Sequence, residues 1–397
     1  MVDHRRGLQE ARVLTRAGVD VLLDDPRGYL GTRSVGLVTN TTGVTGALES
    51  TLDALHRHPG VKLRAVFGPE HGARGDVQDA LSVESHLDEA TGLPVYSLYG
   101  ERVKPTPGMT DGLDALVFDV QDCGVRFYTY VSTLTHCMEA AARDGLDVLV
   151  LDRPNPVNGL SVEGNILEPG YASFVGLHPI PVRHGLTVGE LASLINEEIM
   201  CSLEVVEMDG WSRGMWFDET GLPWVQPSPN LPTLDTATVY PGTCFFEGVN
   251  VSEGRGTTRP FEYLGAPWVD GGRWAEALNA AGLPGVRFRP CYFTPVFWRY
   301  VGESCGGLQV HVTDREVYRP VEAGLHMLST LMRLQGDMFR FNEPTYDERR
   351  HFDLLAGTDR LRLSLGEGVP VEEIVGAWEP GLERFMKVRE RHLLYGE

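Results

Sequence analysis

The sequence predicts an α/β fold, with a Rossmann-like, mostly parallel sheet domain followed by a smaller α+β domain. In the first half of the chain, β-branched apolar runs alternate with polar turns and helical stretches. Near-continuous apolar strands in this rhythm are typical of a parallel sheet covered by helices on both faces. The rhythm stops near residue 241. We therefore place a Rossmann-like domain at residues 1–241 and a smaller α+β domain at residues 242–397, which completes a cleft.

The predicted strands of the first domain are short apolar segments that each run into a polar turn. They cover Ser34–Val38, Leu63–Phe67, Ala115–Val120, Asp147–Leu151 and Leu203–Met208. Helical periodicity covers Leu48–His58 and Thr129–Arg143, and a capping-box pair, Thr187 with Glu190, begins a helix that reaches about Ile199. Because parallel strands share one carboxyl edge, we expect the turns to cluster there, where open α/β sheets bind ligands.

The second domain lacks this alternation. Residues 211–241 are rich in Pro, Gly and aromatic side chains, which favours a long functional loop. Beyond them the pattern predicts helices at Trp274–Ala281, Val317–Leu334 and Gly381–Leu393, and strands at Arg287–Tyr292 and Leu308–Val312.

Composition excludes several classes of protein. The formal charge of −20 disfavours nucleic acid and anionic membrane as partners. No apolar run approaches the roughly 18 residues of a membrane span, and the N-terminal residues lack the apolar core of a secretory signal. Six cysteines lie far apart without a C-x-x-C pair, which favours free buried thiols. We expect a cytoplasmic protein that binds a small ligand, with an oligomeric state that the sequence leaves open.

The turn from Gly68 to Gly75 is the densest cluster of reactive side chains. It places Glu70 and His71 directly after a predicted strand, and the flanking glycines permit close approach of a ligand. Either side chain is a candidate acid or base, and His71 is alternatively a residue that orients Glu70. We therefore predict a ligand site at this turn.

Other strand-end turns supply candidate partners. Asp119 and Asp122 follow one strand, where either is a candidate second carboxylate for glycoside hydrolysis or a helix cap. The Phe127–Tyr130 segment, including Tyr128, offers rings for stacking on a sugar or for core packing. A carboxylate ligand calls for a bidentate arginine, and the candidates in or beside the turns are Arg74, Arg126, Arg153, Arg255 and Arg259.

Two motif matches are rejected. The glycine-rich segment 248–260 lacks the G-K-[ST] ending of a P-loop, so it is read as a loop that lines a cleft or as a hairpin connection. Residues 302–306 fit G-x-S-x-G, yet a strand pattern follows them where a nucleophile elbow needs a helix. No G-x-G-x-x-G follows the first strand, and the histidines show no metal-binding spacing such as H-E-x-x-H. We expect neither a dinucleotide nor a metal.

With these motifs, the chain resembles the NamZ-type exo-β-N-acetylmuramidases, formerly described as a domain of unknown function. The resemblance runs from about Val35 to the C-terminus. The motifs that carry it are Gly36–Asn40, Phe67–Gly72, Phe118–Asp122, Arg126–Tyr130, Leu151–Pro156, Ser228–Asn230 and Glu253–Thr257. It implies release of N-acetylmuramic acid from the non-reducing end of peptidoglycan fragments, without a cofactor, in a cleft between the two domains. Several relatives are exported.

The resemblance also implies that Glu70 is the catalytic residue, and we assign the further roles on that basis. Glu70 would protonate the glycosidic oxygen and His71 would assist it, with Asp122 or Glu253 as the second acid. The predicted ligands of the sugar, including its lactyl carboxylate, are Asn40, Arg74, Arg126, Tyr128, Asn155, Asn230, Glu253 and Arg255. The alternative is a protein that binds muropeptides or sugars without cleaving them, which would need no acid.

Overall fold

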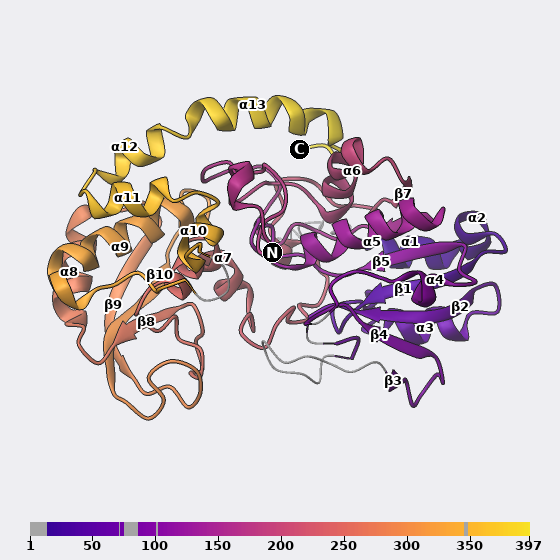
Figure 1. The fold of residues 1–397 in the computed structure, drawn as a ribbon, viewed down its shortest axis with the longest axis horizontal. Coiled ribbons are helices and arrows are strands. Elements are labelled where there is room, and N and C mark those ends of the chain that lie inside the picture. Colours follow the sequence, from indigo (N-terminus) through magenta and orange to yellow (C-terminus); the bar gives the residue numbers. More distant parts are fainter. Residues whose placement is uncertain (1–13, 71, 75–85, 101, 345–347) are drawn as a thin grey trace, which may run out of the picture.

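The first half of the chain forms a twisted, mostly parallel sheet. The computed structural model describes residues 14–70, 72–74, 86–100, 102–344 and 348–397. Within them the first sheet has the strand order β3-β4-β2-β1-β5-β6-β7, and only the pair β3/β4 is antiparallel (Figure 1). Its strands are β1 Ser34–Thr39, β2 Lys62–Gly68, β3 His86–Leu87, β4 Pro94–Ser97, β5 Ala115–Asp119, β6 Asp147–Leu151 and β7 Ser202–Val206. The predicted Rossmann-like architecture is confirmed.

The strand order determines where a ligand would bind. Apart from the short edge strand β3, it matches the Rossmann order 3-2-1-4-5-6. The chain reverses its direction of travel across the sheet between β1 and β5. Ligands of such sheets bind outside the carboxyl ends of the strands at this switch point. Asn40 follows β1 and Asp122 lies in the turn after β5, so both belong to this region.

Helices cover both faces of the sheet, as the apolar pattern predicts. One face packs on α5 and α6, through residues such as Leu134 and Leu191. The other packs on α1 and α3, through Leu22 and Leu55. The helices of this half are α1 Gly18–Asp24, α2 Pro26–Leu30, α3 Thr51–Arg57, α4 Pro107–Thr110, α5 Tyr130–Asp144 and α6 Val188–Ile199. No helix in the described ranges has the length and apolar character needed to cross a bilayer.

The second half builds a small antiparallel sheet covered by helices. Its strand order is β8-β10-β9, formed by β8 Tyr263–Ala266, β9 Val286–Phe293 and β10 Cys305–Val312. Strands β9 and β10 were predicted, whereas β8 was not. The helices are α7 Leu234–Thr243, α8 Gly271–Ala281, α9 Pro320–Gln335, α10 His351–Ala356, α11 Arg360–Gly366, α12 Val371–Gly376 and α13 Glu379–Arg389. In Figure 1, α13 arches back from this half toward α6.

The predicted loop at residues 211–241 ends in a helix instead. Helix α7 begins after Thr233, whose side chain accepts the amide of Thr236, and it continues past the predicted boundary at residue 241. Pro241 lies within this helix, and Gly242 packs directly against α9: a Cβ at Gly242 would lie 1.8 Å from the carbonyl oxygen of Pro320. Tertiary packing therefore overrides the local helix-breaking signal. The division into domains at 241/242 stays a prediction.

Two buried charges of the first half bind helix ends of the second half. Glu163 Oε1 accepts the backbone amide of Glu322 in the first turn of α9, at 2.8 Å. The Arg126 guanidinium donates to the carbonyls of Leu355 and Ala356 at the end of α10, at 3.0 and 2.8 Å. A carboxylate at a helix N-terminus and a cation at a C-terminus both complement the helix dipole. These contacts fix how the two halves dock.

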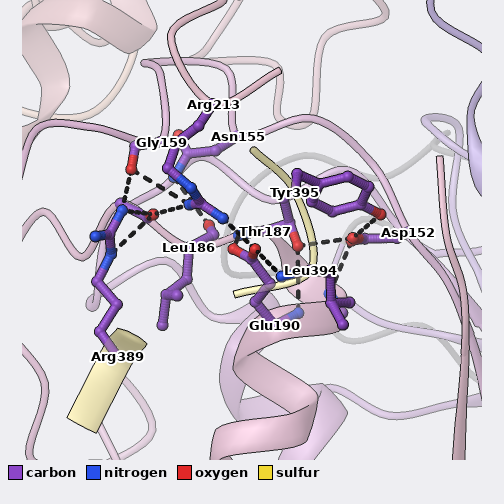
Figure 2. A network of polar contacts seen from close by, with 12 residues as sticks. Asp152, Asn155, Gly159, Leu186, Thr187, Glu190, Arg213, Arg389, Leu394 and Tyr395 are labelled. Atoms are coloured by element: carbon purple, nitrogen blue, oxygen red, sulfur yellow. Dashed lines mark hydrogen bonds and ion pairs between the residues drawn. The ribbon is translucent and has the colours of Figure 1, made fainter. Parts of the chain in front are cut away.

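The C-terminal tail returns to the first half through the polar network of Figure 2. Leu394 N–H donates to Glu190 Oε1 at 2.9 Å, and the Tyr395 hydroxyl donates to Asp152 Oδ2 at 2.6 Å. Arg213 pairs with the same Glu190, while Arg389 donates to the carbonyls of Gly159 and Gly185. Glu190 also closes the predicted capping box of α6. The tail therefore joins the end of the chain to the sheet domain.

The pH dependence of stability should change in Glu163→Gln. Burial raises the pKa of Glu163 to about 7 from a usual value of 4.5. The folded state holds the proton more tightly than the unfolded state. The contribution of Glu163 to the free energy of unfolding is therefore fully present below about pH 4.5 and is lost as the pH rises through 7. Urea unfolding gives the free energy of unfolding at pH 5 and pH 8. The difference between variant and wild type in this free energy should shift by about 2–3 kcal/mol in favour of the variant from pH 5 to pH 8.

Glu168→Gln is the matched control, because Glu168 lies at the same junction but is partly exposed. It should keep the pH dependence of the wild type. A pH dependence of Glu163→Gln that also equals that of the wild type would show that Glu163 is not the titrating group.

Candidate active site

The Glu70 turn follows β2, as predicted. Gly68 ends the strand, and a Cβ there would lie 2.7 Å from the backbone nitrogen of Ala73, so the chain folds back tightly over this glycine. Glu70 is half-buried, and its Oε2 accepts the hydroxyl of Thr129 at 3.0 Å. Thr129 immediately precedes α5, so the turns after β2 and β5 meet at this carboxylate. His71 lies outside the described residues.

Two buried phenols stand beside Glu70. Burial, followed by the charge of Glu70 among its neighbours, holds the pKa of Tyr130 well above its usual value. Burial also holds the pKa of Tyr128 well above its usual value, with further contributions from Cys123, Tyr130, Tyr240 and Glu70. The two rings pack edge to face, with centroids 4.9 Å apart. Both hydroxyls therefore stay protonated at neutral pH beside the carboxyl group.

Tyr130 joins three strand-end and loop segments. Its hydroxyl donates to the carbonyl of Pro227 at 2.5 Å and accepts from Asn40 Nδ2 at 2.7 Å. The amide oxygen of Asn40, Oδ1, accepts hydrogen bonds from the hydroxyl and the backbone N–H of Thr42. Asn40 is therefore buried and fully engaged in orienting its neighbours. The same contact to Pro227 brings the predicted Ser228–Asn230 motif to this site, where Asn230 is also buried.

Asp122 forms a buried pair with His184, which sequence reasoning did not single out. Asp122 Oδ2 accepts the amide of Gly124 at 2.7 Å and lies 3.8 Å from His184 Nε2. His184 Nδ1 accepts the amide of Leu186, so the proton of a neutral ring sits on Nε2 and faces the carboxylate. Neither Asp122 Oδ1 nor His184 Nε2 has a hydrogen-bond partner within the described part of the chain. Asp122 and His184 therefore form a buried carboxylate–imidazole pair after β5.

A chain of packed aromatic rings connects Tyr128 to the second half of the molecule. Tyr128 packs on Tyr240 of α7, with centroids 5.9 Å apart, and Tyr240 packs on Phe261 at 4.7 Å. The guanidinium of Arg255 lies over Phe261, 4.9 Å from the ring centroid. Predicted site residues from both halves therefore belong to one continuous cluster.

Arg255 is held by two carboxylates. Its Nη1 lies 2.9 Å from Glu253 Oε1, and its Nη2 lies 3.0 Å from Glu247 Oε1. Burial alone would raise the pKa of Glu247, but Arg255 and then His351 lower it to about 2. Glu253 is fully buried, and its Oε2 has no hydrogen-bond partner among the residues that the structure describes.

Three predicted ligands lie in other surroundings. Arg74 donates to Asp88 and Asp53, which raises its pKa further, and it clamps α3 to the turn after β3. Arg126 is buried and donates to four backbone carbonyls at the domain junction. Asn155 is buried and bonds the backbone of Val157 and Leu186. All three side chains are therefore bound by other groups of the protein.

Sequence reasoning missed several members of the cluster. Thr129 and Tyr130 belong to the segment quoted for its aromatics, but no pattern in it indicates a bond to Glu70. Tyr240 lay in the predicted loop. His184 lies between Arg183 and Gly185, and nothing in that local sequence indicates a contact with Asp122. Asp119, the other candidate second carboxylate, is fully buried and forms a bidentate pair with Arg153.

A cavity of about 680 Å³ lies away from this cluster, between α6 and the helices α11–α13. None of the predicted site residues lines it. Its walls are mainly apolar, with charged side chains such as Glu197 and Arg384 among them. Strand-end geometry, and not the size of this cavity, therefore locates the candidate active site.

Comparison with known proteins identifies the family. The model of the N-terminal region of exo-β-N-acetylmuramidase NamZ matches residues 35–235, and that of the C-terminal region matches residues 238–395. The chain belongs to the NamZ family. It is 49% identical over 382 residues to the peptidoglycan β-N-acetylmuramidase NamZ of Bacillus subtilis, covering 96% of this chain and 91% of that protein. The resemblance seen in the motifs is confirmed.

Two crystal structures from Bacteroides fragilis share the NamZ-family fold. Both are described as DUF1343 family proteins. One has a TM-score of 0.90 and 40% sequence identity, covering 97% of this chain and all of its own. The other has a TM-score of 0.77 and 32% identity, covering 96% of this chain and 99% of its own. The similarity therefore spans both halves of the molecule.

Tyr130→Phe should destabilise the protein. It removes one hydroxyl that bonds both Asn40 and Pro227, so a buried amide and a buried carbonyl lose their partner. Leaving such groups unsatisfied costs about 1–3 kcal/mol of unfolding free energy. Urea unfolding measures the loss. Tyr292→Phe, at an 82% exposed position, is the control and should change stability by less than about 0.5 kcal/mol. Equal stability of the two variants would contradict this role of Tyr130.

Proposed function

We propose that this protein is an exo-acting β-N-acetylmuramidase, a glycoside hydrolase that releases N-acetylmuramic acid from the non-reducing end of peptidoglycan fragments. Its membership of the NamZ family supports the activity. The observation that carries the proposal is the position of Glu70. A carboxyl group at the carboxyl end of a central strand, fixed by Thr129 and flanked by two protonated phenols, suits an acid that acts on a sugar.

Glu70 is the proposed proton donor. In glycoside hydrolysis a carboxylic acid protonates the leaving oxygen while a second carboxylate acts on the opposite side of the sugar. Thr129 holds Glu70 Oε2 in place by donating a hydrogen bond. The neutral hydroxyl of Tyr128 supplies a hydrogen-bond donor without adding charge. His71 stays the proposed residue that assists Glu70.

Asp122 is the proposed second carboxylate. It lies in the same turn as Thr129, which contacts Glu70, and its Oδ1 has no hydrogen-bond partner in the described ranges. His184 Nε2 faces its other oxygen at 3.8 Å and would hold the carboxylate in position. Glu253, the alternative, is already paired with Arg255 and is better suited to orienting that guanidinium.

Arg255 is the proposed ligand of the lactyl carboxylate. Of the three arginines predicted for this role, Arg74 and Arg126 are engaged elsewhere, whereas Arg255 adjoins the aromatic chain that leads to Glu70. Asn230 stays a proposed ligand of the sugar. Asn40 and Asn155 would act by positioning their neighbours, because both have their amide groups engaged by protein atoms. A cytoplasmic location stays a prediction.

Glu70→Gln should greatly lower turnover while binding is retained. The amide keeps the shape of the side chain and can still accept from Thr129, but it has no proton to give to the leaving oxygen. Loss of a general acid lowers kcat by about 10²–10⁴-fold. A chromogenic β-N-acetylmuraminide with a poor leaving group reports turnover, and equilibrium titration with N-acetylmuramic acid reports binding.

Glu89→Gln is the control, because it changes an exposed glutamate in a neighbouring turn and should leave kcat unaltered. Near-normal turnover by Glu70→Gln would refute the role of Glu70 as acid. A wild-type protein that binds the sugar yet releases no dye would instead support the non-catalytic alternative.

A further inference from the structure

A loop beside Arg255 presents apolar side chains to solvent. It connects β9 to β10 and covers residues 294–304. Val296 is 77% exposed, Phe297 42%, Trp298 56% and Val301 55%. Single exposed apolar residues are common, but a contiguous exposed patch marks a site of interaction. None of these four residues belongs to the site described above.

The loop is anchored from behind. Arg299, the residue after Trp298, donates to the carbonyls of Val249 and Glu247. The hydroxyl of Tyr300 donates to the carbonyl of Asn250 at 2.8 Å. The two residues after Trp298 therefore bind the protein through inward-pointing polar groups. These bonds hold the backbone that carries the exposed rings of Phe297 and Trp298.

Further backbone bonds close the loop and tie it to the glycine-rich segment. Gly302 N–H donates to the carbonyl of Pro295 at 2.9 Å, and Val296 N–H donates to the carbonyl of Gly256 at 2.9 Å. A Cβ at Gly256 would lie 2.5 Å from the carbonyl oxygen of Phe297, so only glycine permits this approach. The segment that carries Arg255 thus packs directly against the loop at residues 294–304.

The backbone at the exposed ring is strained. Trp298 has φ 72° and Tyr300 has φ 59°, in the left-handed region that bulky side chains rarely adopt. Such conformations persist only where the surrounding structure enforces them, and they cluster at ligand-binding sites. Here the bonds of Arg299 and Tyr300 enforce the conformation and hold Trp298 outward.

Trp298 is also in contact with the candidate active site. The guanidinium of Arg255 lies over its ring, 5.8 Å from the centroid, and over Phe261 at 4.9 Å on the aromatic chain that leads to Tyr128. Arg255 thus covers part of the indole surface, while the ring stays 56% exposed. The exposed indole is therefore a flat surface next to the proposed ligand of the lactyl carboxylate.

We propose that Trp298 and Phe297 form a stacking platform for the neutral sugar ring that directly follows the cleaved bond in the glycan strand. This inference rests on the proposed exo-acting function, in which the terminal sugar occupies the site and the rest of the strand extends over the surface. The apolar face of a pyranose packs on aromatic side chains such as these. The charge of −20 favours a neutral ring over an anionic partner such as an acidic membrane.

The test compares two substrates. One is an aryl β-N-acetylmuraminide, which has no sugar after the cleaved bond, and the other is a tetrasaccharide from peptidoglycan with terminal N-acetylmuramic acid. The readout is the ratio of kcat/KM for the tetrasaccharide to kcat/KM for the aryl glycoside. Trp298→Ala should lower this ratio about tenfold, the loss expected for one well-packed aromatic contact.

Three further variants sharpen the test. Trp298→Phe keeps a ring and should retain most of the ratio, whereas Phe297→Ala should lower it about threefold. Tyr292→Ala is the matched control, because it removes an 82% exposed ring whose edge lies over Gly306 on the neighbouring strand. It should leave the ratio unchanged.

Two outcomes would overturn the platform. The first is an unchanged ratio in both Trp298→Ala and Phe297→Ala. The second is a wild-type dimer in size-exclusion chromatography that Trp298→Ala converts to a monomer, which would make the patch an interface between copies. A wild type that cleaves neither substrate would count against the proposed function itself, so the two failures are distinguishable.

Discussion

The structure depends on two buried ionisable side chains that form hydrogen bonds across the junction between the halves. Glu163 binds an amide at the start of α9, and Arg126 binds carbonyls at the end of α10. Side chains this well buried, 7% and 2% exposed, would be costly without partners. Helix ends supply the partners, because each end leaves backbone groups without intrahelical bonds. Both sets of hydrogen bonds therefore join the first half to the second.

This junction also sets the geometry of the candidate active site. Arg126 lies three residues before Thr129, and its own amide bonds the carbonyl of Val182. The short segment between them is therefore fixed at one end by the second half and presents Thr129 to Glu70 at the other. Because the aromatic chain through Tyr240 leads on to Arg255, the site is built jointly by both halves. Its precision follows from docking, and not from the sheet alone.

The sheet could be predicted from the sequence because buried parallel strands have a recognisable pattern, a run of β-branched residues that ends in a polar turn. Strand β4, Pro94–Ser97, lacks this pattern, since it is short and begins with proline. Helix α7 was not predicted from the sequence, for a different reason. Its Pro241 and Gly242 are local signals of a loop, whereas the close packing of Gly242 against α9 is a tertiary contact that local sequence does not indicate.

Position along a strand predicts where a side chain starts, but not where a long side chain ends. Glu70 has a shorter side chain than arginine, so its place beside the β5 turn followed from the parallel strands. A guanidinium reaches several ångströms and binds whichever oxygens the fold brings near. The acceptors of Arg126 lie 39 to 230 residues away in the chain. Local sequence contains no information about such partners, which is why three arginines with similar surroundings in the sequence, Arg74, Arg126 and Arg255, occupy such different environments in the structure.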